Sequence, residues 1–154
     1  MRSTAHDLDE IEQRVRFFVT QHLAGTGRAP STEKIALKCG LSPQSVEEVL
    51  HRLQGAHAIV LAPGSTNVWM APPFSAVPTS FPVETSDVRY WANCAWEMLS
   101  VSALLGVDST STTQCPDCAD ELTIRICGGE LEPTETVVHF AVPAIRFWEN
   151  IGFT

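Results

Sequence analysis

Residues 90–106 read Tyr-Trp-Ala-Asn-Cys-Ala-Trp-Glu-Met-Leu-Ser-Val-Ser-Ala-Leu-Leu-Gly, a stretch with the apolar content and length of a buried helix. Between residues 88 and 107 the only charged side chains are Arg89 and Glu97. Cys94 lies three residues before Glu97, and residues spaced i and i+3 share one helix face. Because an unpaired carboxylate is costly to bury, we interpret the pair as functional. The thiol would hold a soft metal beside an acid that delivers a proton.

Cys94 has a second interpretation, as a small hydrophobic core residue, which is the usual role of a single buried cysteine. Two features favour a reactive thiol instead. Glu97 is expected on the same face, and Arg89 is near in sequence. The expected position close to a helix start also favours a thiolate, because the positive end of the helix dipole lies there.

The first 70 residues alternate helical periodicity with turn signals. We expect three helices followed by two short strands, over residues 7–24, 32–39, 43–54, 58–61 and 67–70. Ser42 resembles an N-cap with Pro43 at the first helical position, and Gly40 closes the preceding helix. Three helices and a small hairpin form the pattern of a winged helix-turn-helix domain.

Beyond this region the pattern changes to a proline-rich connector and then to short strands. The connector contains four prolines, too many for a helix. Residues 121–127 and 136–142 alternate as strands, and His139 in the second is expected to be a hydrogen-bonded structural histidine. The predicted fold class is α+β, with a winged-helix-like domain at 1–70, a connector at 71–86 and a small mixed core of one helix and antiparallel strands at 87–154.

Charge is distributed unevenly along the 154 residues, whose net charge is −8. Residues 1–80 carry seven basic and seven acidic side chains, whereas residues 81–154 carry three and eleven. No basic stripe is present, and the third expected helix offers Glu47 and Glu48 where a recognition helix would offer basic side chains. Nucleic-acid binding is therefore disfavoured.

The sequence contains no signal for export or for membrane insertion. Its start is polar and acidic, without the apolar segment of a signal peptide. The longest apolar run, Met98–Val107, is too short to span a bilayer. Five cysteines without a secretory signal are expected to be reduced thiols or metal ligands. We therefore expect a cytoplasmic protein.

Cys115 and Cys118 have the Cys-x-x-Cys spacing of a metal knuckle. A structural zinc site needs four ligands, and no second Cys-x-x-Cys is present. Cys127 and His139 would complete a zinc site only if the fold brings them to the knuckle. The alternatives are a turn with two buried thiols or a redox pair.

The stretch around Cys94 resembles the organomercurial (alkylmercury) lyase family. The resemblance rests on Tyr90-Trp-Ala-Asn-Cys94-Ala-Trp-Glu97-Met-Leu, followed by Ala103-Leu-Leu-Gly106. Cys115 follows 21 residues after Cys94, and His139-Phe140 is similar to a His-Phe strand of the family. With the winged-helix-like segment upstream, the resemblance spans nearly the whole chain in the same order.

This resemblance implies protonolysis of a carbon–mercury bond. Cys94 would capture the soft Hg(II) of an organomercurial as a thiolate, and a second thiolate would raise electron density on the leaving carbon. A carboxylic acid would then protonate that carbon to give hydrocarbon and thiolate-bound Hg(II). The family uses an aspartate three residues after the first cysteine, and here that residue is Glu97, one methylene longer. Burial would raise its pKa, which suits a proton donor near neutrality.

The same resemblance implies no required cofactor. The partners would be a small organomercurial substrate and cellular thiols that release the Hg(II) product. The family's second catalytic cysteine follows the His-Phe strand, whereas this sequence stops at Phe153-Thr154. Three explanations stay open: a truncated chain, a degenerate relative, or a UGA codon that is read as selenocysteine. The nucleotides after the Thr154 codon distinguish them.

The leading prediction is an organomercurial lyase, or a fragment or relative of one. Two other functions remain open. A winged-helix regulator coupled to a cysteine-rich metal or redox sensor would need a basic DNA-binding face. A protein that binds Hg(II) or zinc without turnover would account for a missing second thiolate. Substrate range and oligomeric state are not fixed by the sequence.

Overall fold

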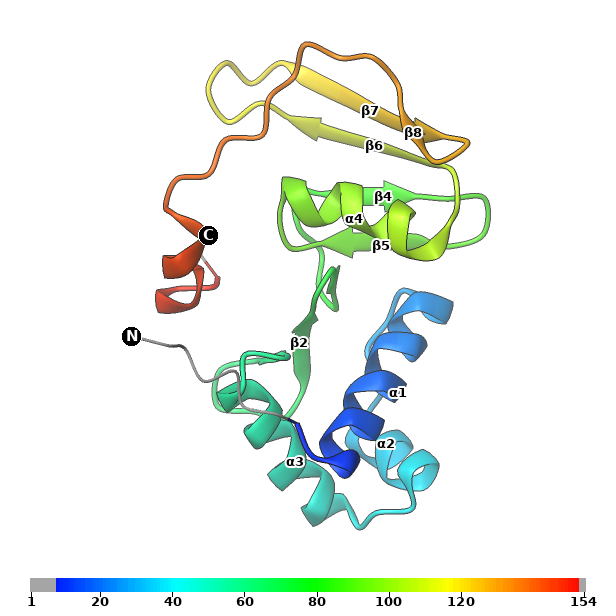
Figure 1. Ribbon diagram of the computed structural model, residues 1–154, viewed down its shortest axis with the longest axis vertical. Coiled ribbons are helices and arrows are strands. Elements are labelled where there is room, and N and C mark those ends of the chain that lie inside the picture. Colours follow the sequence, from blue (N-terminus) through cyan, green and yellow to red (C-terminus); the bar gives the residue numbers. More distant parts are fainter. Residues whose placement is uncertain (1–7, 153–154) are drawn as a thin grey trace.

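The computed structural model describes residues 8–152, so the expected helix start at Asp7 and the terminal Phe153-Thr154 lie outside the described residues. The helices are α1 (Glu10–Thr26), α2 (Thr32–Cys39), α3 (Pro43–Gly55), α4 (Ala95–Leu105) and the 3-10 helix η1 (Ala144–Glu149). The strands are β1 (Val60–Leu61), β2 (Val68–Ala71), β3 (Phe74–Ser75), β4 (Pro82–Glu84), β5 (Arg89–Ala92), β6 (Ser109–Gln114), β7 (Glu121–Cys127) and β8 (Glu130–Leu131). Figure 1 shows α1 to α3 at one end of the molecule and β4 to β7 at the other.

Local signals account for the three N-terminal helices, which are confirmed. Asp9 caps α1 and forms a reciprocal capping box with Glu12. Ser31 caps α2, and Ser42 caps α3 with Pro43 in the first turn. These side chains satisfy the main-chain N–H groups that a helix leaves free at its start, so the boundaries follow closely from the sequence.

One antiparallel sheet connects the helical end to the rest of the molecule. Its strand order is β1-β2-β3-β5-β4-β6-β7-β8. The expected hairpin after α3 is present as β1 and β2, shifted by one or two residues. The proline-rich segment 71–86 is not a bare connector, because it supplies β3 and β4. The observed fold is α+β, as predicted.

The expected helix over residues 90–106 is only partly correct. Residues 90–92 belong to strand β5, and the helix begins at Ala95. Tyr90 and Trp91 are aromatic residues that favour strands, and they pair with Val83 and Pro82 of β4. The Tyr90 hydroxyl also donates a hydrogen bond to the Ala24 carbonyl of α1, which anchors this strand to the helical end.

The expected strand over residues 136–142 is wrong. Strand β8 pairs with β7 at Glu130–Leu131, and residues 132–143 then continue without regular secondary structure. Alternating apolar residues form a strand only beside a partner edge, and no strand of residues 8–152 pairs with this segment. His139 is exposed, so it is not the structural histidine that we expected.

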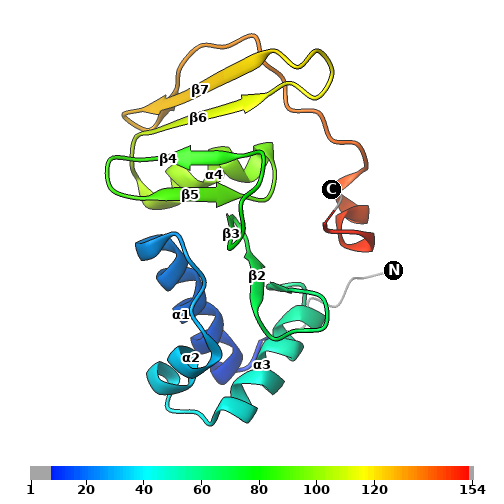
Figure 2. The same cartoon turned by 180° about the vertical axis from the view of Figure 1, so that it is seen from behind.

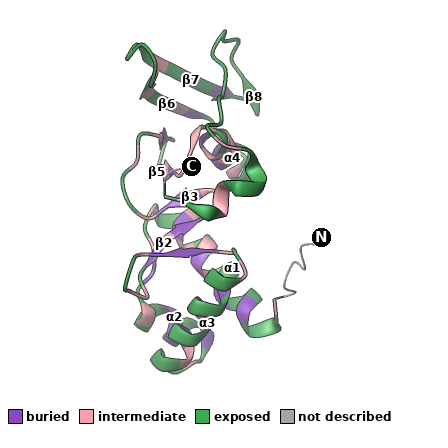
Figure 3. Cartoon of the chain, turned by 90° about the vertical axis from the view of Figure 1, so that its left-hand side faces the viewer, coloured by how far each residue is buried: buried purple, intermediate pink, exposed green. Residues whose placement is uncertain are grey.

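A continuous hydrophobic core runs from the helices into the sheet. It includes Val15 and Leu50 from the helices, Phe74 from the sheet and Val101 from α4. Helix α4 covers one face of β4 and β5, which lie in front of it in the reverse view (Figures 1 and 2). Buried residues concentrate in the middle of the molecule, whereas β7 and β8 are largely exposed (Figure 3). No helix within residues 8–152 is long and apolar enough to cross a membrane.

Candidate active site

The junction between β5 and α4 places the two candidate catalytic side chains. Cys94 is the N-cap of α4, with extended backbone angles of φ −151° and ψ 174°. Glu97 is the third residue of the helix, the position from which an acidic side chain reaches back toward the N-cap. The pair therefore meets through cap geometry instead of lying on one helix face. The predicted proximity of thiol and carboxylate is present, although its structural basis differs.

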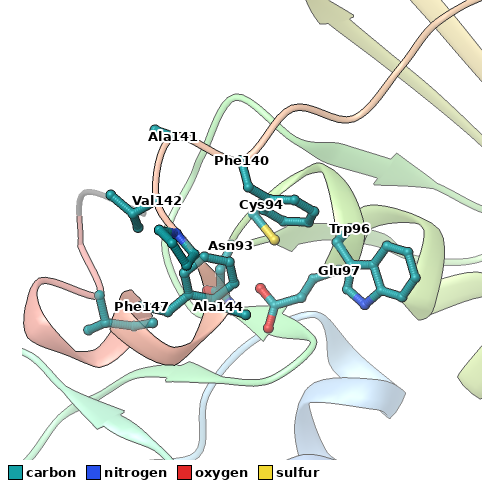
Figure 4. Close-up of a pocket in the computed structure, with 11 residues that line it drawn as sticks. Asn93, Cys94, Trp96, Glu97, Phe140, Ala141, Val142, Ala144 and Phe147 are labelled. Carbon is teal, nitrogen blue, oxygen red and sulfur yellow. The ribbon is translucent and has the colours of Figure 1, made fainter.

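Both side chains face a cavity of about 660 Å³. Figure 4 shows the Cys94 sulfur and the Glu97 carboxylate pointing into the same space, below the ring of Phe140. The full lining is Asn93, Cys94, Trp96, Glu97, Phe140, Ala141, Val142, Pro143, Ala144, Phe147 and Ile151. Apart from the junction residues, the wall comes from the C-terminal segment and is mostly apolar.

Two aromatic residues of this wall are not core residues, although aromatic side chains usually are. Trp96 is 61% exposed and Phe147 is half-buried, and both line the cavity. Sequence reasoning also gave no role to Asn93 or Phe140. The aromatic-rich composition of residues 143–152 was the one sequence signal for this cavity wall. The contact itself could not be predicted, because it joins segments far apart in sequence and depends on the tertiary fold.

Opposing effects act on the Cys94 thiol. Burial raises its pKa above the ordinary value, and the negative charge of Glu97 raises it further. The main-chain N–H groups of Glu97 and Trp96 point at the sulfur and lower the pKa, as expected at a helix N-terminus. Burial is the larger effect, so the resting site favours a protonated thiol.

Burial also raises the pKa of Glu97. Hydrogen bonds from the Asn93 side-chain amide, the Cys94 thiol and the Asn93 main-chain N–H each lower this pKa, but they do not outweigh burial. The Cys94 thiol is thus the donor and the Glu97 carboxylate the acceptor in one hydrogen bond. Two titratable groups joined by a hydrogen bond can exchange one proton directly.

Asn93 precedes the pair and is incompletely satisfied. Its side-chain amide lies 3.5 Å from the Phe74 carbonyl, at the limit of a hydrogen bond. Its Oδ1 atom is buried without a hydrogen-bond partner in the described part of the chain. An orphaned buried polar atom is unusual away from functional sites, and here it lies at the cavity wall.

The C-terminal segment docks over the site through aromatic contacts. Trp148 stacks on His57, with ring centroids 4.3 Å apart and planes 3° from parallel. Phe140 and Phe147 pack on each other at 5.5 Å. A second cavity of about 450 Å³, lined by Trp69 and His139 among others, lies beside Cys94. The thiol is therefore flanked by two spaces that share the segment as a wall.

The remaining cysteines lie away from this site. Cys39 is buried against the helices, and Cys115, Cys118 and Cys127 lie on the β6–β8 part of the sheet. None of them lines either cavity. No group of three or more His, Cys, Asp or Glu side chains within residues 8–152 has metal-site geometry, so Cys127 and His139 do not join the knuckle.

The knuckle itself is a polarised pair of thiols. Main-chain N–H groups of Cys118 and Asp117 donate to the Cys115 sulfur, which lowers the pKa of Cys115, and the Cys118 thiol donates to it as well. A main-chain hydrogen bond from Asp120 lowers the pKa of Cys118, but the side-chain hydrogen bonds to Asp120 and Cys115, together with burial and the charge of Cys115, outweigh it and raise that pKa. Zinc at these two residues stays a prediction.

A thiol and a carboxylic acid that share a proton inside an apolar cavity define a site for thiol capture and proton delivery. The family model MerB, described as alkylmercury lyase, matches residues 74–153, just over half of the chain. The chain belongs to the alkylmercury lyase family. The predicted family and the predicted function, an organomercurial lyase or a relative or fragment of one, are thereby confirmed.

A solved structure has a similar fold. The crystal structure of the mercury-bound form of MerB2 matches with a TM-score of 0.62 and 17% sequence identity, over 82% of this chain and 67% of that chain. At this identity the likeness supports the fold alone. A search of curated proteins finds no match.

Proposed function

We propose that Cys94 and Glu97 carry out carbon–mercury protonolysis as a proton-sharing pair. The observation that supports this most directly is the hydrogen bond from the Cys94 thiol to the Glu97 carboxylate in the apolar cavity. Capture of a soft metal requires a thiolate, and cleavage of the carbon–mercury bond requires a proton donor. Transfer of one proton across this contact would produce both the thiolate at Cys94 and the proton donor at Glu97.

The step begins with the thiol protonated and Glu97 ionised. As the Cys94 sulfur bonds to the mercury of R–Hg–X, the thiol proton passes to the Glu97 carboxylate. Glu97 then gives that proton to the carbon as the carbon–mercury bond breaks. The balance is R–Hg–X plus Cys94–SH to R–H plus Cys94–S–Hg–X. No cofactor enters this balance, and Hg(II) leaves the step as a bound product.

A second sulfur ligand would weaken the carbon–mercury bond, and none of the other cysteines lines the cavity. We propose that a cellular thiol supplies this sulfur and later exchanges the Hg(II) away from Cys94. The cavity of about 660 Å³ has room for a small thiol beside an organomercurial. A requirement for abundant free thiols also supports a cytoplasmic setting.

Hydrocarbon release tests this function. The chain is incubated with phenylmercury or methylmercury and excess glutathione, and benzene or methane is measured by gas chromatography. We expect release from the wild-type chain and from Cys127→Ser, whose exposed thiol lies outside the cavities, and none from Cys94→Ser. Mercury retained at Cys94 without hydrocarbon would instead indicate a binding protein without turnover. Undiminished release from Cys94→Ser would contradict the assigned nucleophile.

We infer that the N-terminal helices and hairpin form a winged-helix-like scaffold, with boundaries near residues 70 and 86, and not a DNA reader. Glu47 and Glu48 are exposed on α3. Arg52, the basic residue of its last turn, is bound through Nε to Glu12 Oε1 at 2.7 Å. An acidic helix face repels phosphates. A sequence-specific gel shift with DNA at low salt would support the alternative function, a winged-helix regulator.

A further inference from the structure

The turn between β6 and β7 holds two thiols in a fixed arrangement. The hairpin register closes at Gln114 and Glu121, and the turn lies at its free end (Figure 1). Cys115 N–H donates to the Asp120 carbonyl at 2.9 Å, and Ala119 N–H donates to the Cys115 carbonyl at 2.9 Å. Ala119 adopts a left-handed φ of 62°, which is uncommon for a residue other than glycine. This strained conformation of Ala119 keeps the turn tight.

Three donors converge on one sulfur of this turn. The main-chain N–H groups of Asp117 and Cys118 point at the Cys115 sulfur, and so does the Cys118 thiol. These contacts hold the Cys115 sulfur in place beside Cys118. The two sulfurs are adjacent, and Cys118 is exposed to solvent. A metal can therefore reach both of them directly.

The number of available ligands decides which metal fits. Zinc in a structural site takes four ligands, but no group of three or more candidate ligands exists within residues 8–152. Hg(II) differs because it is satisfied by two thiolates in a linear arrangement, and thiolates select soft metals. The two sulfurs of the turn thus supply all the ligands that Hg(II) needs, but only two of the four that structural zinc needs.

We propose that Cys115 and Cys118 form a second Hg(II) site, in which one Hg(II) replaces both thiol protons to give a two-coordinate dithiolate. The balance is Hg(II) plus two thiols to S–Hg–S plus two protons, with no change of oxidation state. The proposal rests on the proposed function only for the source of the metal. Cys94 offers Hg(II) one protein sulfur, whereas the turn offers two, so transfer from Cys94 to the turn is favourable and frees the active site.

Retention of inorganic Hg(II) tests the site without any carbon–mercury cleavage. The chain carrying Cys94→Ser is reduced, mixed with HgCl₂ and excess glutathione, desalted and analysed for mercury by mass spectrometry. We expect about one equivalent per chain in this background. With Cys115→Ser and Cys118→Ser added, retention should fall at least tenfold, whereas Cys127→Ser should leave it unchanged. Thermal melting checks that each variant is folded.

X-ray absorption on the Cys94→Ser chain loaded with HgCl₂ provides a measurement that leaves the turn unchanged. Two sulfurs in linear geometry support the proposal, and three or four sulfurs overturn it. Equal retention by the variant lacking both turn cysteines also overturns it, as does zinc held as tightly as Hg(II). Because the Cys94→Ser background does not cleave substrate, failure of the lyase assay and failure of this site are separate results.

Discussion

Replacement of Glu97 by glutamine removes the proposed proton carrier from the cavity while keeping its shape. Cys94 and Glu97 are the titratable residues in the cavity lining of the described chain, so no other side chain there can take over. The loss should equal the whole general-acid contribution, about 10²–10⁴-fold in rate. This corresponds to about 3–5 kcal/mol of transition-state stabilisation. Capture of mercury by the Cys94 sulfur should persist, because the thiol is unchanged and its proton can leave to solvent instead of to residue 97.

The assay separates the two steps. Hydrocarbon released in a single turnover is measured beside mercury retained on the protein, for the wild-type chain, Glu97→Gln and the control Glu47→Gln. Glu47 is an exposed carboxylate on α3, far from the cavity lining. We expect normal retention with strongly slowed release for Glu97→Gln alone. Release within tenfold of wild type would refute the assignment of Glu97 as proton donor.

Although Glu97→Gln should lower activity, it should raise the stability of the folded chain at high pH. Burial raises the pKa of Glu97 in the folded chain, so the folded state binds more protons than the unfolded state. Stability then falls as pH rises from the unfolded pKa of about 4.5 through the folded value. Neutral glutamine has no such penalty, so Glu97→Gln should melt at a higher temperature than wild type at pH 8, with less difference at pH 4. A lower melting temperature at both pH values would contradict this.

Three further predictions follow from described contacts. Activity should show a bell-shaped pH profile, rising with ionisation of Glu97 above its ordinary 4.5 and falling as Cys94 loses the shared proton above its ordinary 9.0. Gly27→Ala should destabilise the chain by more than about 1 kcal/mol in denaturant melts. Gly27 has φ 67°, and an added Cβ would lie 2.6 Å from the Arg89 carbonyl. Glu12→Gln should cost about 1–3 kcal/mol. Because hydrogen bonding depresses the folded pKa of Glu12, that contribution should fade as pH drops through the folded value.

Elements set by neighbouring residues could be predicted closely from the sequence. Ser31 and Ser42 mark helix starts, and Gly40 marks the end of α2 with a left-handed φ of 63°. Each signal acts within a few residues of itself, so no knowledge of the tertiary fold was needed. The strand over Glu121–Cys127 was likewise predicted with its observed bounds.

Elements that need distant partners could not be predicted. The alternation in residues 136–142 suggested a strand, but the described chain offers it no edge. Tyr90 looked helical in a local window, yet it pairs with Val83 and bonds to Ala24. Phe140 reaches the cavity wall only because the C-terminal segment returns across the molecule. In each case long-range contact overrides local pattern.

The position of Cys94 explains how, in the proposed mechanism, a half-buried thiol would stay unreactive until it meets mercury. A thiolate exposed at a helix N-terminus would be oxidised or alkylated by many reagents. Here burial and the charge of Glu97 outweigh the main-chain N–H groups, so the proton stays on the pair. In that mechanism mercury would change this balance, because a sulfur–mercury bond would displace the thiol proton and the hydrogen bond would direct that proton to Glu97. Under the proposed mechanism, this arrangement keeps Cys94 protonated until a soft metal binds, and metal binding then protonates the acid that would cleave the carbon–mercury bond.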